Sequence, residues 1–297
     1  MACESHVYES PPEGAAVDWT IPQDWAAYSQ EDHHTWDLLF ERQVEQLPGR
    51  ASQAFLDGID VLSLSKPGIP DFEELSEKLM ELTGWQVVAV PGLVPDDVFF
   101  DHLANRRFVA GNFIRRPDQL DYLQEPDVFH DVFGHVPLLA NPAFGDYMAA
   151  YGRGGLRALE FGSLNKLARL YWYTVEFGLI EEEGALRIFG AGIVSSHGES
   201  IFALDDPSPN RIGFDLKRVM RTNYRIDDFQ QVYFVIPSFE ELLRVTVETD
   251  FAPLYRELEN SSDLAPDDID DDDTVITIGT QAYAEAKANG ARAASAG

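Results

Sequence analysis

Two histidines and one glutamate have the residue types and the setting to bind a metal together. His130 and His135, two of the chain's seven histidines, lie five positions apart in the motif FHDVFGHVP. Glu176 lies in the aromatic and apolar stretch LYWYTVEFGL, where a carboxylate needs a partner because burying an unpaired charge is costly. Two imidazoles and one carboxylate on one side of an iron(II) ion leave neighbouring positions open for oxygen or water. These residue types are the ones that recur in non-heme iron oxygenases, which makes a metal site one interpretation of them.

The spacing of the histidines leaves other interpretations open. On a regular α-helix, residues i and i+5 point about 140° apart, so both rings reach one ion only where the helix is distorted or ends. Gly134 and Pro137 could provide such an ending. The alternatives are one capping and one core histidine without a metal, and a Glu176 that pairs with Arg169.

Motifs for other common chemistries do not occur in the sequence. There is no HExxH helix, no GxxxxGK phosphate loop, no GxGxxG dinucleotide fingerprint and no GxSxG nucleophile elbow. The glycine cluster GRGG at 152–155 lacks the preceding strand of a dinucleotide site, and we expect it to form a turn.

The elements that must position these residues are predicted to be mainly helical. Apolar residues at helical spacing, with capping residues, predict helices at 31–47, 71–84, 164–180 and 239–247. Short strands are predicted at 85–90, 107–115, 186–189 and 232–236. Asp96 and Asp127 are expected to cap two further helices, the second of which carries the histidine motif.

The chain is expected to form one domain with a loose segment at each end. Residues 1–24 are rich in proline and acidic residues without periodicity, and 261–297 contain an aspartate-rich linker and a tail of small residues. The sequence therefore predicts a catalytic domain at 25–260, mainly α with small β elements, followed by an acidic, disordered C-terminal tail.

Three blocks of sequence, in order, resemble the pterin-dependent aromatic amino acid hydroxylases. They are LQEPDVFHDVFGHVPLL at 123–139, LARLYWYTVEFGL at 167–179 and FGAGIVSSHGES at 189–200. The resemblance runs from about residue 23 to about residue 258 and is closest to the bacterial phenylalanine 4-hydroxylases. It implies a single, mostly helical catalytic domain that hydroxylates L-phenylalanine to L-tyrosine. The implied reaction uses O2, non-heme Fe(II) and tetrahydrobiopterin or a related tetrahydropterin.

The resemblance also implies a role for particular residues. His130, His135 and Glu176 would hold the iron. The pterin would lie against Gly92, Val94, Phe99, Asp131, Ala168 and Tyr171, with Phe99 stacked on its ring. The substrate would contact Arg115, Leu123, Trp172, Gly192 and Ser195. Arg115 would grip the substrate carboxylate with two parallel hydrogen bonds, and Ser195 would support a histidine ligand from behind. Leu123 stands where the animal enzymes have a threonine, so no hydroxyl contact is expected there.

Composition restricts the partners and the compartment. A net charge of −29 disfavours binding to nucleic acids and anionic membranes, and no run of about 18 apolar residues occurs. Cys3 is the only cysteine, which predicts a chain without internal disulfides in a reducing cytoplasm. No regulatory domain is expected before the catalytic domain, and the tail has no leucine heptads, so a monomer is expected. Because carboxylates greatly outnumber basic residues, their mutual repulsion should destabilise the fold at low ionic strength, as in proteins of a salt-rich cytoplasm.

Three other functions remain as alternatives. The same family hydroxylates tryptophan or tyrosine, and pocket shape decides among these substrates. A zinc hydrolase could use the same His, His and Glu ligands with an activated water, although it would need a nearby general base and no pterin shelf. A non-catalytic helical binding protein would carry no stoichiometric metal.

Overall fold

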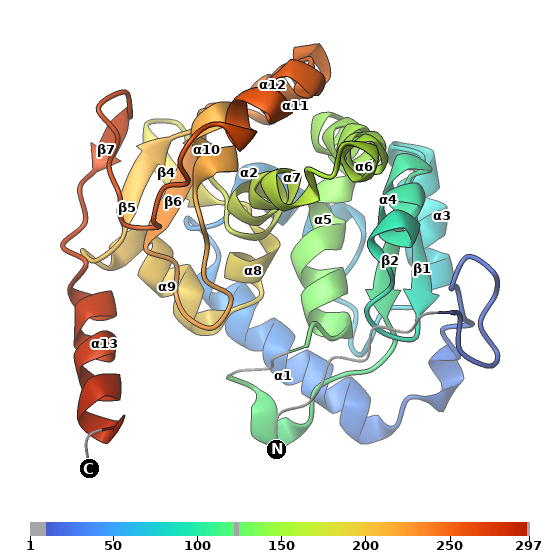
Figure 1. Ribbon diagram of the computed structural model, residues 1–297. Helices are drawn as coiled ribbons and strands as arrows, with labels where there is room; N and C mark the ends of the chain where they lie inside the picture. Colours follow the sequence, from blue (N-terminus) through green and yellow to red (C-terminus); the bar gives the residue numbers. More distant parts are fainter. Residues whose placement is uncertain (1–9, 122–124, 296–297) are drawn as a thin grey trace.

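Helices make up most of the molecule, and the strands form two small sheets (Figure 1). The computed structural model describes residues 10–121 and 125–295. The α-helices are α1 (Gln30–Gln46), α2 (Gln53–Val61), α3 (Phe72–Leu82), α4 (Asp96–Ala104), α5 (Val136–Leu139), α6 (Pro142–Phe161), α7 (Leu164–Tyr171), α8 (Ala191–Val194), α9 (His197–Asp205), α10 (Leu216–Arg221), α11 (Phe239–Glu248), α12 (Phe251–Glu259) and α13 (Ala282–Ser295). The strands are β1 (Gln86–Val90), β2 (Arg107–Gly111), β3 (Leu179–Glu182), β4 (Ala185–Ile188), β5 (Asn210–Gly213), β6 (Val232–Ile236) and β7 (Val275–Thr277). There are also 3-10 helices, η1 (Trp25–Ala27) and η2 (Pro117–Gln119), and π-helices, η3 (Phe129–His135) and η4 (Trp172–Glu176). The mainly α class with small β elements is confirmed.

The two sheets lie on opposite sides of the molecule, with α5, α7 and α8 between them (Figure 1). The smaller sheet pairs β1 with β2 in parallel, and α4 forms the connection between them. The larger sheet has the order β4-β3-β6-β5-β7 and mixes parallel and antiparallel pairs. No helix in the described ranges is both long and apolar enough to cross a membrane.

Most predicted elements lie at the expected places in the sequence, with different ends. Helices α1, α3 and α11 and strands β1, β4 and β6 overlap the predicted ranges. Strand β2 is shorter than predicted and ends at Gly111. Asp96 is the first residue of α4 and its side chain makes no capping hydrogen bond, so the prediction that it caps this helix is wrong.

The glycine cluster at 152–155 lies inside α6, so the predicted turn is wrong. A Cβ atom at Gly155 would lie 2.0 Å from a ring carbon of Phe100, and one at Gly152 would lie 2.4 Å from the backbone nitrogen of Ala104. Both glycines therefore let α4 pack directly on α6. A helix tolerates glycine at some cost in stability, and here the close approach of the two helices accounts for it. The same contact fixes α4, which carries Phe99.

Several residues between 261 and 295 pair with the rest of the fold, where the sequence predicted a disordered tail. Strand β7 pairs with β5, and Asp263 forms ion pairs with Lys166 and Arg169. The carboxylate of Asp273 pairs with Arg218, with side-chain exposures of 3% and 6%. Composition predicts that these aspartates repel one another in solvent, whereas the fold supplies them with buried basic partners.

A cluster of aromatic rings supports the back of the helix that carries the histidine motif. Phe129 and Phe133 stack at 4.7 Å, and Phe133 also meets Phe40 and Phe55 edge-on. Trp36 of α1 packs edge-on against Phe129 at 5.2 Å. Because Phe129 and Phe133 are fully buried in the core, the other side of η3 faces the site.

Candidate metal centre and pocket

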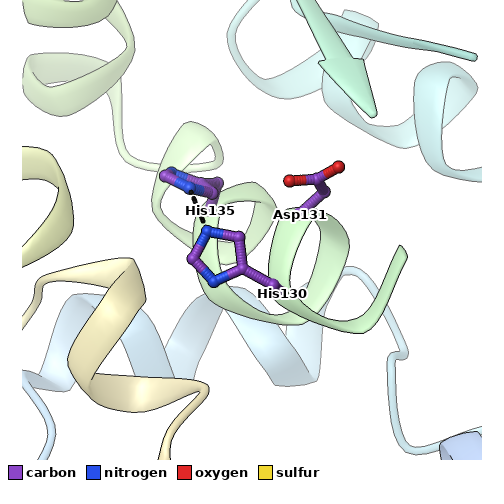
Figure 2. A group of neighbouring side chains, drawn as sticks. All are labelled: His130, Asp131 and His135. Carbon is purple, nitrogen blue, oxygen red and sulfur yellow. Dashed lines mark hydrogen bonds between the residues drawn. The ribbon is translucent and has the colours of Figure 1, made fainter. Parts of the chain in front are cut away.

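His130 and His135 lie on the π-helix η3, and this explains how residues five apart face one point. In a π-helix the backbone hydrogen bonds join residues i and i+5, so these two positions lie close together on the same side. The Nε2 atoms of the two rings are 3.3 Å apart (Figure 2). The helix distortion that the spacing required is present as a full π-helical segment.

Glu176 ends the second π-helix, η4, and completes the cluster. Its Oε1 lies 3.2 Å from Nε2 of His135, and its Oε2 lies 3.6 Å from Nε2 of His130. Arg169, the alternative partner, instead binds Asp263 and the side chain of Asn223. The carboxylate is therefore directed at the two imidazoles.

Hydrogen bonding fixes the tautomer of His130. Ser195 donates its hydroxyl proton to the carbonyl oxygen of Ala191 at 2.7 Å, and its oxygen lies 3.0 Å from Nδ1 of His130. Since the hydroxyl proton is used, the serine oxygen accepts from Nδ1–H, which leaves the lone pair of Nε2 directed into the cluster. Burial lowers the pKa of His130 to about 4, which favours the neutral ring that a metal needs.

A second carboxylate, that of Asp131, lies beside the histidines (Figure 2). An oxygen of Asp131 lies within 4.8 Å of ring nitrogens of both histidines. The carboxylate is already used, however, because its Oδ2 accepts a 2.8 Å hydrogen bond from the backbone N–H of Gly111. Burial raises the pKa of Asp131 to about 7. Burial opposes ionisation of Glu176 too, but His135 and His130 outweigh it and keep its pKa below the ordinary value. Glu176 is therefore the better anionic ligand.

The donor set fits an iron(II) ion. Ligands about 2.1 Å from one ion and at right angles to each other lie about 3 Å apart, close to the spacing of these two nitrogens and two oxygens. Nδ1 of His135 is buried without a hydrogen-bond partner among the described residues, so its ring is held by packing, with Phe108 at 5.0 Å.

Two cavities meet at this cluster. Residues that line both are Glu125, Pro126, His130 and Glu176. The larger cavity, of about 540 Å³, is also lined by Arg115, Trp172, Phe177, Gly192 and Ser195. The smaller, of about 260 Å³, is also lined by Gly92, Val94, Phe99, Asp131, His135 and Tyr171. The arrangement offers one metal position between two separate binding spaces.

The residues that the sequence assigned to the substrate line the larger cavity, and those assigned to the pterin line the smaller one, with two exceptions. Leu123 lies outside the described residues. Ala168 is half-buried on α7 and is not among the residues that line the smaller cavity. Within that cavity, Phe99 and Tyr171 meet edge-on at 5.9 Å, which leaves an aromatic wall for a flat ligand.

Arg115 is buried and bound on one side to Asp127. Its Nε and one terminal nitrogen each donate to a different oxygen of Asp127 at 2.8 Å. Within the ranges that the structure describes, the other terminal nitrogen makes only a long, 3.5 Å contact with the carbonyl oxygen of Leu120. One edge of the guanidinium therefore remains available to a ligand carboxylate in the larger cavity.

Two functional residues were missed in the sequence. Asp127 was identified only as a helix cap, but it also holds Arg115 and accepts from the backbone N–H of His130 at 3.0 Å. Phe177 lines the larger cavity, with its ring centre 4.7 Å from that of Trp172. Asp127 could have been found as an acidic residue twelve positions after Arg115. The sequence marks Phe177 only by its position next to Glu176.

The sequence and the fold are similar to those of known proteins. The family model of the biopterin-dependent aromatic amino acid hydroxylases matches residues 18–258. The phenylalanine-4-hydroxylase of Caulobacter vibrioides is 65% identical over 276 residues, which cover 93% of this chain and 94% of that protein. The phenylalanine-4-hydroxylase of Chromobacterium violaceum is 57% identical over 264 residues, 89% of each chain. A crystal structure of the latter with iron and phenylalanine bound superposes with a TM-score of 0.84 at 56% identity, and covers 88% of this chain and 95% of that one.

Proposed function

The chain belongs to the biopterin-dependent aromatic amino acid hydroxylases, and on this premise we propose that it converts L-phenylalanine to L-tyrosine. It is a pterin-dependent, iron-containing monooxygenase that consumes O2. The observation that carries the proposal is the convergence of His130, His135 and Glu176 at the meeting point of two cavities.

In this proposal His130, His135 and Glu176 hold the iron, and the smaller cavity holds the tetrahydropterin. When bound, the iron and the reduced pterin supply the activation of dioxygen, which no side chain can perform. The protein contributes orientation. Ser195 holds the ring of His130, and the edge-on pair of Phe99 and Tyr171 provides a wall for the pterin.

The larger cavity holds the amino acid. The free edge of Arg115 binds the substrate carboxylate, while Asp127 keeps the guanidinium in place from its other side. Trp172 and Phe177 form an aromatic wall beside the ligand cluster. The substrate ring is thereby directed toward the metal position.

Phenylalanine is preferred over the alternative substrates of the family. The relatives that cover most of this chain, at 65% and 57% identity, are phenylalanine-4-hydroxylases. Membership in the family also replaces the zinc hydrolase and the non-catalytic binding protein as explanations of the same three ligands.

We further propose residues 25–260 as the catalytic unit, a monomeric state and a cytoplasmic location. The family model covers nearly the same range. The single cysteine, Cys3, suits a reducing compartment.

Product analysis tests the function. The purified chain is supplied with Fe(II), O2, a reduced tetrahydropterin and phenylalanine, tyrosine or tryptophan in separate reactions. Tyrosine formed from phenylalanine, with one pterin oxidised per product, is the expected result. Hydroxylation of only tryptophan or tyrosine would contradict the proposed substrate.

A further inference from the structure

The indole of Trp172 is held between two rings in the wall of the larger cavity. It stacks on Tyr224 at 4.4 Å with an interplanar angle of 18°, and it meets Phe177 at 4.7 Å and 37°. Stacking fixes the plane of the ring, but a half-turn about the Cβ–Cγ bond would leave that plane unchanged and reverse the side on which the N–H lies. The indole N–H is the polar handle that can fix this rotation, and it donates to Oε1 of Gln230 at 2.9 Å.

The side chain of Gln230 is itself fixed in one orientation. It is 2% exposed, and its Nε2 donates to the carbonyl oxygens of Arg225 at 2.9 Å and Asp228 at 3.2 Å. Two acceptors can be satisfied only by the NH2 group of the amide, so Oε1 must point the other way, toward Trp172. All three contacts agree on this orientation.

The backbone beside this amide is anchored as well. The backbone N–H of Gln230 donates to Oε1 of Glu199 on α9 at 3.3 Å, and the hydroxyl of Tyr233 donates to the same oxygen. Glu199 is 4% exposed, so both bonds lie in the interior. The acceptor that Trp172 uses is therefore hydrogen-bonded through both its side chain and its backbone, and an acceptor held in this way can orient a ring.

We propose that Gln230 is a positioning residue that fixes the rotation of the Trp172 indole and thereby sets the shape of the space for the substrate ring. The inference rests on the proposed function, because it concerns the aromatic substrate of the larger cavity. Trp172 lies four residues before Glu176 on the same π-helix, so the wall and the metal ligand share one backbone segment. Rotation of the indole changes the room beside the ligand cluster without removing any ligand.

The test replaces Gln230 by methionine, which keeps the length of the side chain and removes the acceptor. Loss of the fixed wall is expected to raise the KM for phenylalanine about tenfold, with a much smaller change in kcat. The dissociation constant of phenylalanine for the iron-loaded enzyme, measured by calorimetry without turnover, should rise by the same factor. The preference for phenylalanine over tryptophan, measured as the ratio of kcat/KM values, should fall.

Three comparisons separate positioning from a general structural effect. Gln231→Met is the matched control, because the side chain of Gln231 bonds Gln281 and is not among the residues that line the larger cavity. Q231M should leave all these constants unchanged. Gln230→Glu keeps an oxygen for the indole and is expected to restore part of the affinity. In the Trp172→Phe background, which lacks the indole N–H, Q230M should have little further effect.

The outcomes distinguish this inference from the proposed function. If the unaltered chain makes no tyrosine from phenylalanine, the proposed function is wrong. If the unaltered chain is active and folded Q230M has the same KM and dissociation constant, the positioning role is wrong. An effect of Q230M that persists in the Trp172→Phe background overturns it too. If Q230M does not fold, Trp172→Phe decides, because it removes the indole N–H itself: a KM equal to that of the unaltered chain would show that this hydrogen bond does not set the space for the substrate.

Discussion

The Nε2 atoms of His130 and His135 lie 3.3 Å apart although five peptide bonds separate the residues in the chain. A regular α-helix would direct the two rings about 140° apart. The π-helical segment removes this difference, and Glu176 approaches the same point from a second π-helix. The ligand cluster therefore depends on two local departures from α-helical geometry.

Substitution of any one of the three proposed metal ligands by alanine is expected to abolish tyrosine formation. His130→Ala, His135→Ala and Glu176→Ala each remove one donor of the cluster, so the bound iron should fall well below one per chain. Metal analysis of the folded variants, together with product assays, measures both effects. His34→Ala, at an exposed position in α1, is the control. Normal turnover by a folded ligand variant would remove that residue from the site.

Ser195→Ala should weaken iron binding about 10- to 100-fold without unfolding the protein. The serine oxygen accepts from Nδ1 of His130, and without it the ring loses its fixed tautomer and orientation. Competition with a chelator measures the affinity. Ser195→Thr keeps the hydroxyl and should retain most of it. An unchanged affinity in the alanine variant would mean that packing alone orients the ring.

Arg115→Ala is expected to raise the KM for phenylalanine about 10- to 100-fold and to destabilise the fold as well. The structure adds the second effect, because Asp127 is fully buried and would lose its ion pair. Removing one partner of a buried pair costs about 3–5 kcal/mol, or roughly 10 °C in Tm for a chain of this size. Initial-rate kinetics and thermal unfolding measure the two effects. Arg115→Lys keeps the charge, and its KM and Tm should lie between those of the unaltered chain and the alanine variant. An unchanged KM in the alanine variant would mean that another cation binds the substrate carboxylate.

Glu199 is expected to make the fold less stable as pH rises. Burial raises the pKa of its carboxyl to about 7 from an ordinary value of 4.5. Between these values the folded protein binds more protons than the unfolded chain, so stability is lost as pH rises through this window, by up to about 3 kcal/mol. Glu199→Gln should remove this loss. Denaturant unfolding measures the free energy of unfolding of the unaltered chain and of Glu199→Gln at pH 5 and pH 8. If this free energy changed equally with pH in both, Glu199 would not be the group responsible.

Salt is expected to stabilise the protein. A net charge of −29 implies strong mutual repulsion, and at about 1 M salt the Debye length falls to roughly 3 Å. Salt screens buried ion pairs such as Arg218 with Asp273 only weakly, so these pairs should persist. The repulsion between exposed carboxylates should largely disappear. Unfolding midpoints between 0.1 and 2 M KCl should rise. A flat or falling series would contradict a salt-adapted protein.

Much of the fold and the residues of the candidate metal site could be predicted from local patterns. Apolar periodicity located α1, α3 and α11, and residue chemistry singled out His130, His135 and Glu176. The helix periodicity and the setting of these three residues are local features, so they can be recognised in one sequence.

The remaining features depend on contacts between distant segments. The glycines of α6 are needed because Phe100 and Ala104 of α4 pack directly against them. Two aspartates after residue 260 form ion pairs with Arg169 and Arg218. Composition alone assigns glycine to turns and aspartate to solvent. Only the fold shows which partner each one has.

The π-helix η3 also sets the rotational phase of the helix that continues from it. Helix α5 begins directly after His135, and its residues are buried. A turn of a π-helix holds about one residue more than a turn of an α-helix, so η3 could lose one residue and return to α-helical bonding while the residues after it keep their direction. Leu138 and Leu139 would then stay in the core, and the change would be confined to the turn between the two histidines. A change in length of this segment can therefore alter the metal site without being rejected by folding.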